Sequence, residues 1–290
     1  MAHILDGKAL SQKIRKELAK QLTGKERSPH LAIFLTYPDP ASQIYVKNKL
    51  TACDEVGIRT TLLDQEYVST DALLKEIDRY NTNDDVDGIL VQFPLHPNVD
   101  QKSVVQHICP QKDVDGVHPE NLGKLILGDP SGFVPCTPLG IQTLLSSYDI
   151  PLSGKHVVIV GRSITVGKPL TLLLSQKGID ATVTLAHSKT ENLTRLCQSA
   201  DIIVAAVGKP NLIRADMVHE KSVVIDVGIN RKSGSSSLIG DVDFENVSKI
   251  CAAISPVPGG VGPMTIAGLL LNTVKSFQID ILPSIKGGDS

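Results

Sequence analysis

The stretch from His156 to Pro169 decides the fold. It reads His-Val-Val-Ile-Val up to residue 160 and continues as Gly-Arg-Ser-Ile-Thr-Val-Gly-Lys-Pro. Four consecutive β-branched residues predict a buried strand, and the glycine-bounded turn leads into a helical pattern over 166–177. A strand that turns directly into a helix is typical of the first β-α unit of a dinucleotide-binding fold, although an ordinary β-α turn has the same glycines.

Strand and helix patterns alternate on both sides of this unit. Right-handed crossovers between successive strands predict a parallel, doubly wound sheet in the second half, and the first half has its own β-α-β-α-β order. The predicted strands are 31–35, 58–63, 88–93, 156–160, 181–186, 201–207 and 222–227, and the predicted helices are 8–22, 41–56, 71–80, 138–148, 166–177, 191–198 and 264–277.

The chain has 290 residues, more than a single core of typical size needs. We therefore predict an α/β protein with two α/β domains. Residues 1–140 form the first, completed by a C-terminal helix within 263–290, and residues 141–262 form a Rossmann-type second domain. The segment 151–154 is expected to be the hinge.

Composition narrows the class of protein. A net charge of -2 without long charged runs argues against nucleic acid and membrane partners, and no apolar run reaches the ~18 residues that a membrane span needs. Five cysteines without a C-x-x-C pair fit reduced thiols and a cytoplasmic location, and the histidines show no metal-ligand spacing. We expect a soluble protein without a metal site.

The turn from Gly161 to Gly167 departs from the standard nucleotide motifs. It lacks the middle glycine of G-x-G-x-x-G, and both its spacing and Pro169 exclude a P-loop. The next strand ends without the carboxylate that NAD-specific sites place near the ribose 2′-OH. Arg162 and Ser188 are instead available to hold a 2′-phosphate, so we predict NADP as the cofactor.

Polar residues in the first half suggest the chemistry. Tyr45 and Lys49 are four residues apart, so they share one helix face, either as a ligand-binding pair or as a solvated pair. Gln92 ends a buried strand, where open α/β sheets bind ligands, although a structural glutamine would look the same. Asp115 lies in a glycine-containing loop, where it either caps a helix or faces a heterocycle with adjacent N–H donors.

A loop rich in proline and glycine precedes the last helix. Pro256-Val-Pro-Gly-Gly-Val-Gly-Pro-Met-Thr265 contains three glycines that accept positive φ and expose N–H groups, and its prolines limit the entropy lost on ordering. A tight strand-to-helix turn is the simpler interpretation, but close approach to a ligand fits the other segments.

Together these segments resemble the bifunctional methylenetetrahydrofolate dehydrogenase/methenyltetrahydrofolate cyclohydrolase family. The similarity covers nearly the whole chain in the family's order. It is carried by Asp39–Lys49, Val86–Leu95, Lys112–Gly116, Pro135–Gly140, Val160–Pro169, Val224–Asn230 and Pro256–Thr265.

The resemblance implies an NADP-linked homodimer with a folate cleft between its domains. Such an enzyme oxidises 5,10-methylenetetrahydrofolate to the methenyl form and hydrolyses that to 10-formyltetrahydrofolate. This places it in one-carbon metabolism, which serves purine, histidine and methionine biosynthesis.

The resemblance also implies a role for each candidate residue. Lys49 is the central catalytic group, mainly for hydrolysis; Gln92 positions it, Tyr45 stacks on the aminobenzoyl ring and Asp115 binds the pterin. The implied folate contacts are Tyr45, Lys49, Val91, Gln92, Phe93, Asp115, Pro258, Gly259, Gly260, Val261 and Gly262, and the implied NADP contacts are Gly161, Arg162, Ser163, Ser188 and Ile229.

The chain departs from the family pattern at four places, namely Thr36-Tyr37-Pro38, Phe93, Val117 and Ser255. None of these departures removes a candidate catalytic group. They therefore bear on the affinity for folate more than on the reaction that is catalysed. Two rival interpretations remain, a shikimate-type NADP dehydrogenase and a folate-binding module without turnover. A family member with only one of the two activities is a third alternative, because the sequence does not set the balance of the two rates.

Overall fold

The computed structural model describes residues 2–37, 40–67, 69–231 and 238–277. Pro38, Asp39 and residues 278–290, which enter the sequence-based assignments, lie outside them. The chain forms two compact units. The six-stranded unit comprises Met1–Gln12 and Thr137–Thr265, and the three-stranded unit comprises Lys13–Cys136 and Ile266–Ser290.

This division differs from the predicted one at the N-terminus. Residues 1–12 group with the six-stranded unit because β1 (His3–Ile4) pairs in parallel with β11 (Ala253–Ile254). A two-residue strand carries no periodic signal, so its pairing is invisible in the sequence. The chain passes between the units near residues 12, 136 and 265, away from the predicted hinge at 151–154.

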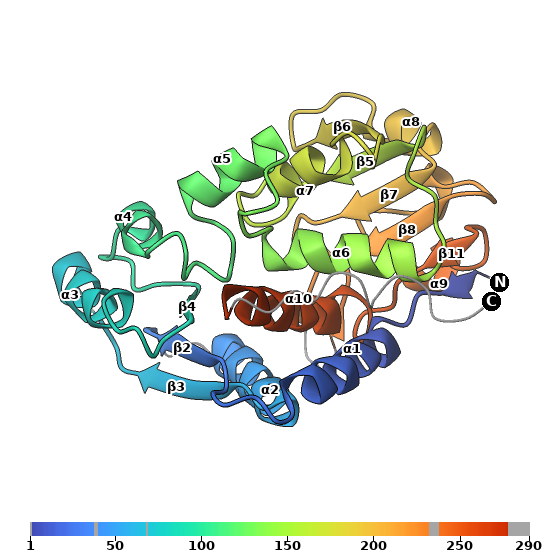
Figure 1. The fold of residues 1–290 in the computed structure, drawn as a ribbon. Helices are drawn as coiled ribbons and strands as arrows, with labels where there is room; N and C mark the ends of the chain where they lie inside the picture. The colour runs from blue at the N-terminus through green and yellow to red at the C-terminus, as the bar shows by residue number, and fades with distance from the viewer. Residues whose placement is uncertain (1, 38–39, 68, 232–237, 278–290) are drawn as a thin grey trace. The chain divides into compact units, whose positions relative to one another are not determined.

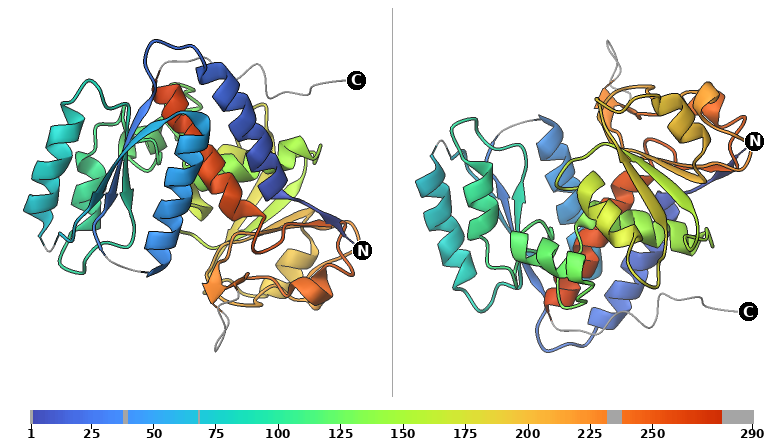
Figure 2. Two further views of the ribbon diagram at one scale, coloured as in Figure 1. Left: turned by 90° about the horizontal axis from the view of Figure 1, so that it is seen from below. Right: turned by 90° about the horizontal axis from the view of Figure 1, so that it is seen from above.

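The three-stranded unit contains the parallel sheet β3-β2-β4. β2 (His30–Leu35) lies in the middle and is buried throughout, with β3 (Arg59–Asp64) and β4 (Gly88–Gln92) on either side. Figure 2 shows α3 and α4 on one face of this sheet and α2 on the other. The helices with more than one residue in this unit are α1 (Gly7–Leu22), α2 (Pro40–Val56), α3 (Thr70–Asn81), α4 (Gln101–His107), α5 (Pro119–Leu127) and α10 (Val261–Ser276).

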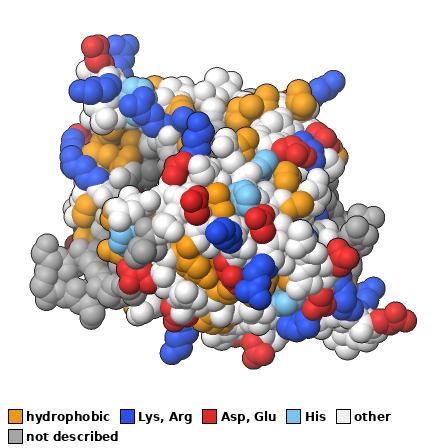
Figure 3. Space-filling model, turned by 90° about the vertical axis from the view of Figure 1, so that its left-hand side faces the viewer, with side chains coloured by type: hydrophobic (Ala, Val, Ile, Leu, Met, Phe, Trp, Pro, Cys, Tyr) orange, Lys and Arg blue, Asp and Glu red, His pale blue; other side chains and the backbone are white. Residues whose placement is uncertain are grey.

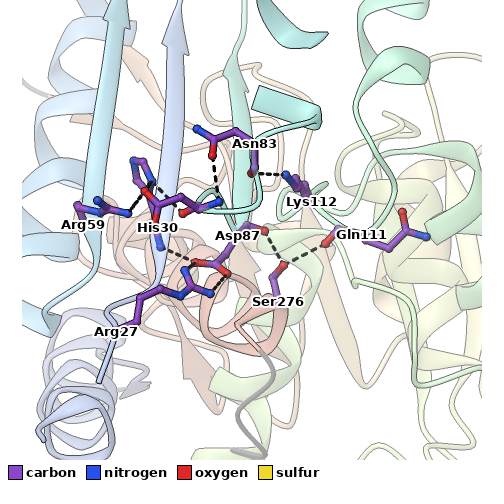
Figure 4. A network of polar contacts seen from close by, with 9 residues as sticks. Arg27, His30, Arg59, Asn83, Asp87, Gln111, Lys112 and Ser276 are labelled. Carbon is purple, nitrogen blue, oxygen red and sulfur yellow. Dashed lines mark hydrogen bonds and ion pairs between the residues drawn. The ribbon is translucent and has the colours of Figure 1, made fainter. Parts of the chain in front are cut away.

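A polar network joins the amino ends of these strands to the end of α10 (Figure 4). The Asp87 carboxylate accepts hydrogen bonds of 2.8 Å from both terminal nitrogens of Arg27 and one of 2.8 Å from the backbone N–H of His30. Ser276 donates to the carbonyl oxygens of Asp87 and Gln111. These bonds fix the sheet at its amino edge, opposite the edge where Gln92 ends β4.

The six-stranded unit contains a parallel sheet in the order β1-β11-β8-β7-β5-β6 within the described residues (Figure 1). The prediction of a doubly wound α/β fold is confirmed. One face packs against α8, η1 and α9 in a buried apolar cluster. The other elements are β5 (His156–Val160), β6 (Thr182–Ala186), β7 (Ile202–Ala205), β8 (Val223–Asp226), the hairpin β9 (Asn230–Arg231) and β10 (Leu238–Ile239), α6 (Cys136–Ser147), α7 (Gly167–Leu174), α8 (Leu193–Gln198), η1 (Ala215–Met217) and α9 (Phe244–Val247).

The short helices α4, α5 and α9 and the 3-10 helix η1 were not predicted, and the first two lie after Asp100, where a loosened pattern was expected. α4 begins because the Asp100 carboxylate accepts hydrogen bonds from the N–H groups of Lys102 and Ser103. α5 begins similarly, with His118 Nδ1 accepting from Glu120 N–H. Helix α7, by contrast, is shorter than predicted, since it ends at Leu174, three residues before the predicted end.

Charges on the surface are mixed. Lys and Arg side chains are interspersed with Asp and Glu on the face shown in Figure 3. No helix in the described part of the chain is long and apolar enough to cross a membrane.

Candidate active site

Helix α2 presents Tyr45 and Lys49 on neighbouring turns. Val46, Ala52, Cys53 and Val56 bury the rest of the helix against the unit. Only 8% of Lys49 is exposed, and its amino group donates a hydrogen bond of 2.8 Å to Oε1 of Gln92. The structure therefore distinguishes between the two interpretations of this pair, because Lys49 lies within the fold and not on a solvated face.

Gln92 is held in one orientation. Its Nε2 donates a hydrogen bond of 2.8 Å to the carbonyl oxygen of Phe93, which also accepts one of 3.2 Å from the Ser42 hydroxyl. Since the amide nitrogen is used in this way, Oε1 faces Lys49. Gln92 therefore fixes the position of the Lys49 amino group.

The loop that carries Asp115 is fixed by its neighbour Asp113. One carboxylate oxygen of Asp113 accepts hydrogen bonds of 2.8 Å from His118 N–H and from the Asn121 amide. Gly116 follows with a φ of 72°, a conformation that favours glycine. Asp115 itself stays half-buried and near enough to Lys49 for each charge to affect the other.

Burial and charge oppose each other in this cluster. Burial lowers the pKa of Lys49, and the Asp115 charge acts in the opposite direction. Burial likewise raises the pKa of Asp115, and Lys49 opposes that rise. Burial also raises the pKa of the half-buried Tyr45, so its phenol stays protonated. A lysine with a lowered pKa beside a fixed amide oxygen is suited to proton transfer.

The other predicted folate contacts differ in how deeply their side chains are buried. Val91 is 4% exposed and belongs to the apolar core, whereas Phe93 is half-buried at the carboxyl end of β4. The loop from Pro258 to Gly262 belongs to the six-stranded unit, and Val261 is 2% exposed. Val91 and Val261 therefore have side chains that serve packing, which leaves their backbone for a ligand.

Positive φ was expected to be open to all three loop glycines, but only one of them adopts it. Gly259 has a φ of 110°, whereas Gly260 and Gly262 do not have a positive φ. Gly260 is required for space instead, because a Cβ there would lie 2.6 Å from the carbonyl oxygen of Pro256. Gly262 lies within α10, which begins at Val261, earlier than predicted.

The turn after β5 has the close packing of a backbone cradle. Gly161 has a φ of 123°, and a Cβ on it would lie 2.0 Å from the carbonyl oxygen of Ala206. A Cβ on Gly167 would lie 1.9 Å from the carbonyl oxygen of Gly161. Both glycines are thus required by geometry, and the turn brings backbone close to any group bound at the start of α7.

The turn lies at the topological switch point of the sheet. β6 and β7 flank β5, so the connections that follow β5 and β7 leave in opposite directions, and open α/β sheets bind ligands outside such a point. Arg162 and Ser188 are exposed after β5 and β6, and Ile229 is 40% exposed after β8. The Ser163 side chain is used within the turn itself, because its hydroxyl accepts hydrogen bonds from Val166 N–H at 3.1 Å and Gly167 N–H at 3.4 Å.

Several buried polar residues near these sites were missed in the sequence. Asn272 on α10 donates hydrogen bonds to the carbonyl oxygen of Val114, which precedes Asp115, and to that of Val134. Asp226 ends β8 just as Gln92 ends β4, so the same rule of a polar residue at a strand's carboxyl end would have found it. No group of three or more His, Cys, Asp or Glu residues suited to a metal ion occurs in the described ranges.

Comparisons with known proteins agree on one family. Residues 5–115 match the profile described as tetrahydrofolate dehydrogenase/cyclohydrolase, catalytic domain, and residues 135–281 match the NAD(P)-binding domain of the same description. The bifunctional protein FolD of Aquifex aeolicus is 51% identical over 284 residues, which covers 96% of each chain.

Solved structures with the same architecture include two enzymes. The bifunctional FolD methylenetetrahydrofolate dehydrogenase/cyclohydrolase of Campylobacter jejuni superposes with a TM-score of 0.92 at 48% identity, covering 96% of this chain and 99% of that one. The Trypanosoma brucei methylenetetrahydrofolate dehydrogenase-cyclohydrolase, solved with NADP and an inhibitor, gives 0.91 at 35% identity, covering 96% and 97%. A shikimate 5-dehydrogenase from Listeria monocytogenes, at 13% identity and a TM-score of 0.51 over 88% and 94%, shares the fold alone.

Proposed function

The chain belongs to the tetrahydrofolate dehydrogenase/cyclohydrolase family, and we propose that it oxidises 5,10-methylenetetrahydrofolate with NADP and hydrolyses the methenyl product at one site built around Lys49. The observation that carries this proposal is the buried Lys49 amino group, held 2.8 Å from Gln92 and influenced by Asp115. A lysine that is desolvated and oriented in this way favours an enzyme over a binding module without turnover.

In the oxidation, the residues of this chain act by positioning. The Tyr45 ring stacks on the aminobenzoyl group, and the Asp115 carboxylate accepts hydrogen bonds from adjacent N–H donors of the pterin. NADP, when bound, supplies the acceptor for the hydride that leaves the methylene carbon. Holding the two reactants in line is the main contribution of the protein to this step.

In the hydrolysis, Lys49 moves protons. Neutral Lys49 accepts a proton from the water that adds to the methenyl carbon, while Gln92 keeps the amino group in place. The bond from that carbon to N5 then breaks, N5 takes up a proton, and the added oxygen becomes the formyl oxygen. The balance is one water consumed and one proton released for each 10-formyltetrahydrofolate formed.

The residues around β5 fit NADP. The Gly161 and Gly167 positions leave no room for a Cβ, as a pyrophosphate cradle requires, and exposed Arg162 and Ser188 are available for a 2′-phosphate. The NADP complex of the Trypanosoma brucei relative supports the same cofactor.

The direct test follows both reactions. Purified protein is mixed with 5,10-methylenetetrahydrofolate and either NADP or NAD, and methenyl formation and its later decay are recorded. We expect NADP-dependent oxidation, then hydrolysis above the spontaneous rate. If the protein binds folate but catalyses neither reaction, it is a binding module. If it oxidises shikimate, it is a shikimate-type dehydrogenase.

We also propose a cytoplasmic homodimer that supplies one-carbon units to purine, histidine and methionine biosynthesis. The five free cysteines suit a reducing compartment. Sedimentation equilibrium would test the dimer, since a single species of 31.1 kDa at micromolar concentration would contradict it.

A further inference from the structure

Two buried carboxylates lie under the loops at the carboxyl edge of the six-stranded sheet. Asp226 is the last residue of β8, and Asp241 follows β10; they are 2% and 0% exposed. The reaction described above assigns neither of them a role.

Asp241 ties together the loops that follow β7 and β8. Its Oδ2 accepts hydrogen bonds from the N–H groups of Val207 at 2.7 Å and Gly208 at 2.9 Å. Its Oδ1 accepts one of 3.0 Å from the side-chain amide of Asn230. Each carboxylate oxygen therefore holds a different loop.

Asp226 in turn holds Asp241. Its Oδ1 accepts hydrogen bonds from the N–H groups of Gly228 at 3.0 Å and Asp241 at 2.9 Å, and its Oδ2 accepts one from Val242 at 3.0 Å. Burial, helped by the Asp241 charge, raises the pKa of Asp226 to about 7, while these N–H donors act in the opposite direction. Six donors in all are aimed at two adjacent carboxyl groups, as two buried acids require.

Glycines make room for this arrangement. A Cβ on Gly228 would lie 2.2 Å from the Asp241 carboxyl carbon, and one on Gly240 would lie 1.7 Å from Asp226 Oδ2. The β7 loop also supports the turn after β5, since Gly161 packs against the carbonyl oxygen of Ala206, next to Val207. Asp241 thus holds the loops after β7 and β8 directly, and it supports the turn after β5 through the β7 loop.

The loops that Asp241 holds expose apolar side chains. Val207 is 39% exposed, Ile229 is 40% exposed, and Ile164 in the β5 turn is 46% exposed. All three follow carboxyl ends of parallel strands around the switch point. Large apolar residues left exposed at this edge fit a surface completed by the rings of a ligand.

We propose that Asp241, supported by Asp226, is a positioning residue for the dinucleotide, which it affects by holding the loops after β7 and β8 in their binding geometry. This inference rests on the proposed NADP-linked function. It assigns no contact between either carboxylate and the cofactor, because their oxygens are already occupied by protein donors.

The test compares the affinity for NADP with a reaction that needs none. In Asp241→Ala, we expect the Kd for NADP and the KM for NADP in the dehydrogenase assay to rise at least about tenfold. Hydrolysis of added 5,10-methenyltetrahydrofolate should stay within about twofold of wild type. Lys49, Gln92 and Asp115 belong to the three-stranded unit, and the Asp241 carboxylate accepts from the loops after β7 and β8 and not from the loop of Pro258 to Gly262.

Two milder variants separate positioning from loss of the fold. Asp241→Asn should retain most of the wild-type affinity for NADP. The amide oxygen of the new side chain can still accept from Val207 and Gly208, and the Asn230 amide can turn over so that its oxygen accepts from the new amide nitrogen. Asn230→Ala removes only the bond to the β8 loop and should weaken NADP binding several-fold. The matched control is Asp216→Ala, an exposed aspartate of the same unit, which should bind NADP as wild type does.

The outcomes are distinct. Unchanged NADP affinity in both Asp241→Ala and Asn230→Ala overturns the inference, as does an equal loss of both activities in Asn230→Ala together with a lowered melting temperature. If wild-type protein binds no NADP, the proposed function fails first, before any variant is compared.

Discussion

Lys49 on α2 and Gln92 at the end of β4 are joined by a hydrogen bond of 2.8 Å, although 43 residues separate them in the chain. The bond is directional, because the Gln92 amide nitrogen is used by the Phe93 carbonyl and only its oxygen faces Lys49. This relationship turns two separate polar residues into one oriented proton-transfer group.

Replacing Lys49 with alanine should remove the hydrolysis. We expect Lys49→Ala to lower kcat for the cyclohydrolase reaction at least about 100-fold, since the group that takes the proton from water is gone. Lys47→Ala, an exposed lysine on the same helix, should behave as wild type. Stopped-flow decay of methenyltetrahydrofolate measures both, and full activity in Lys49→Ala would disprove the mechanism.

The pH dependence of hydrolysis should respond to Asp115. The rate rises with pH as Lys49 loses its proton, and the Asp115 charge raises the pKa of Lys49. Asp115→Asn should therefore move the rising limb of kcat against pH to lower pH, while Asp54→Asn, an exposed change on α2, leaves it in place. A limb that moves to higher pH would contradict the coupling.

Arg162 should set the choice of cofactor. Arg162→Ala is expected to weaken NADP binding about 10- to 100-fold and to change NAD binding little, since only NADP carries the 2′-phosphate. Arg195→Ala, which removes an exposed arginine on α8, controls for net charge. Equal losses for both dinucleotides would show that Arg162 acts on a group that they share.

The Gly161 turn should tolerate no side chain. In Gly161→Ala the new Cβ would meet the Ala206 carbonyl oxygen at 2.0 Å, so we expect the free energy of unfolding to fall by about 2 to 4 kcal/mol. Gly123→Ala, in α5 with no atom within 4 Å of the new Cβ, should instead add about 0.5 to 1 kcal/mol. Urea unfolding monitored by circular dichroism checks both, and a stable Gly161→Ala would show that the turn can shift.

Local sequence patterns were enough to predict most of the elements. Strand β5 has the predicted bounds, because four β-branched residues end at a glycine that adopts a φ of 123°. Helix α3 differs from its prediction by one residue at each end, since Ser69 caps it and its apolar residues keep helical spacing. The pairing of β1 and the helices α4 and α5 were missed because segments of two to nine residues show too little periodicity.

The sequence by itself determined which chemical groups the chain carries and which elements carry them. Helical spacing is enough to place Tyr45 and Lys49 on one face of α2, and a polar residue after an apolar run is enough to place Gln92 at the carboxyl end of a strand. These assignments need only contacts between residues close in the chain.

Only the tertiary structure decided how those groups are buried and paired. The desolvation of Lys49, the orientation of Gln92 and the connection of two loops by Asp241 all depend on residues far apart in sequence. Desolvation and hydrogen-bond geometry arise from packing in three dimensions, and packing around a residue is not encoded in its local pattern.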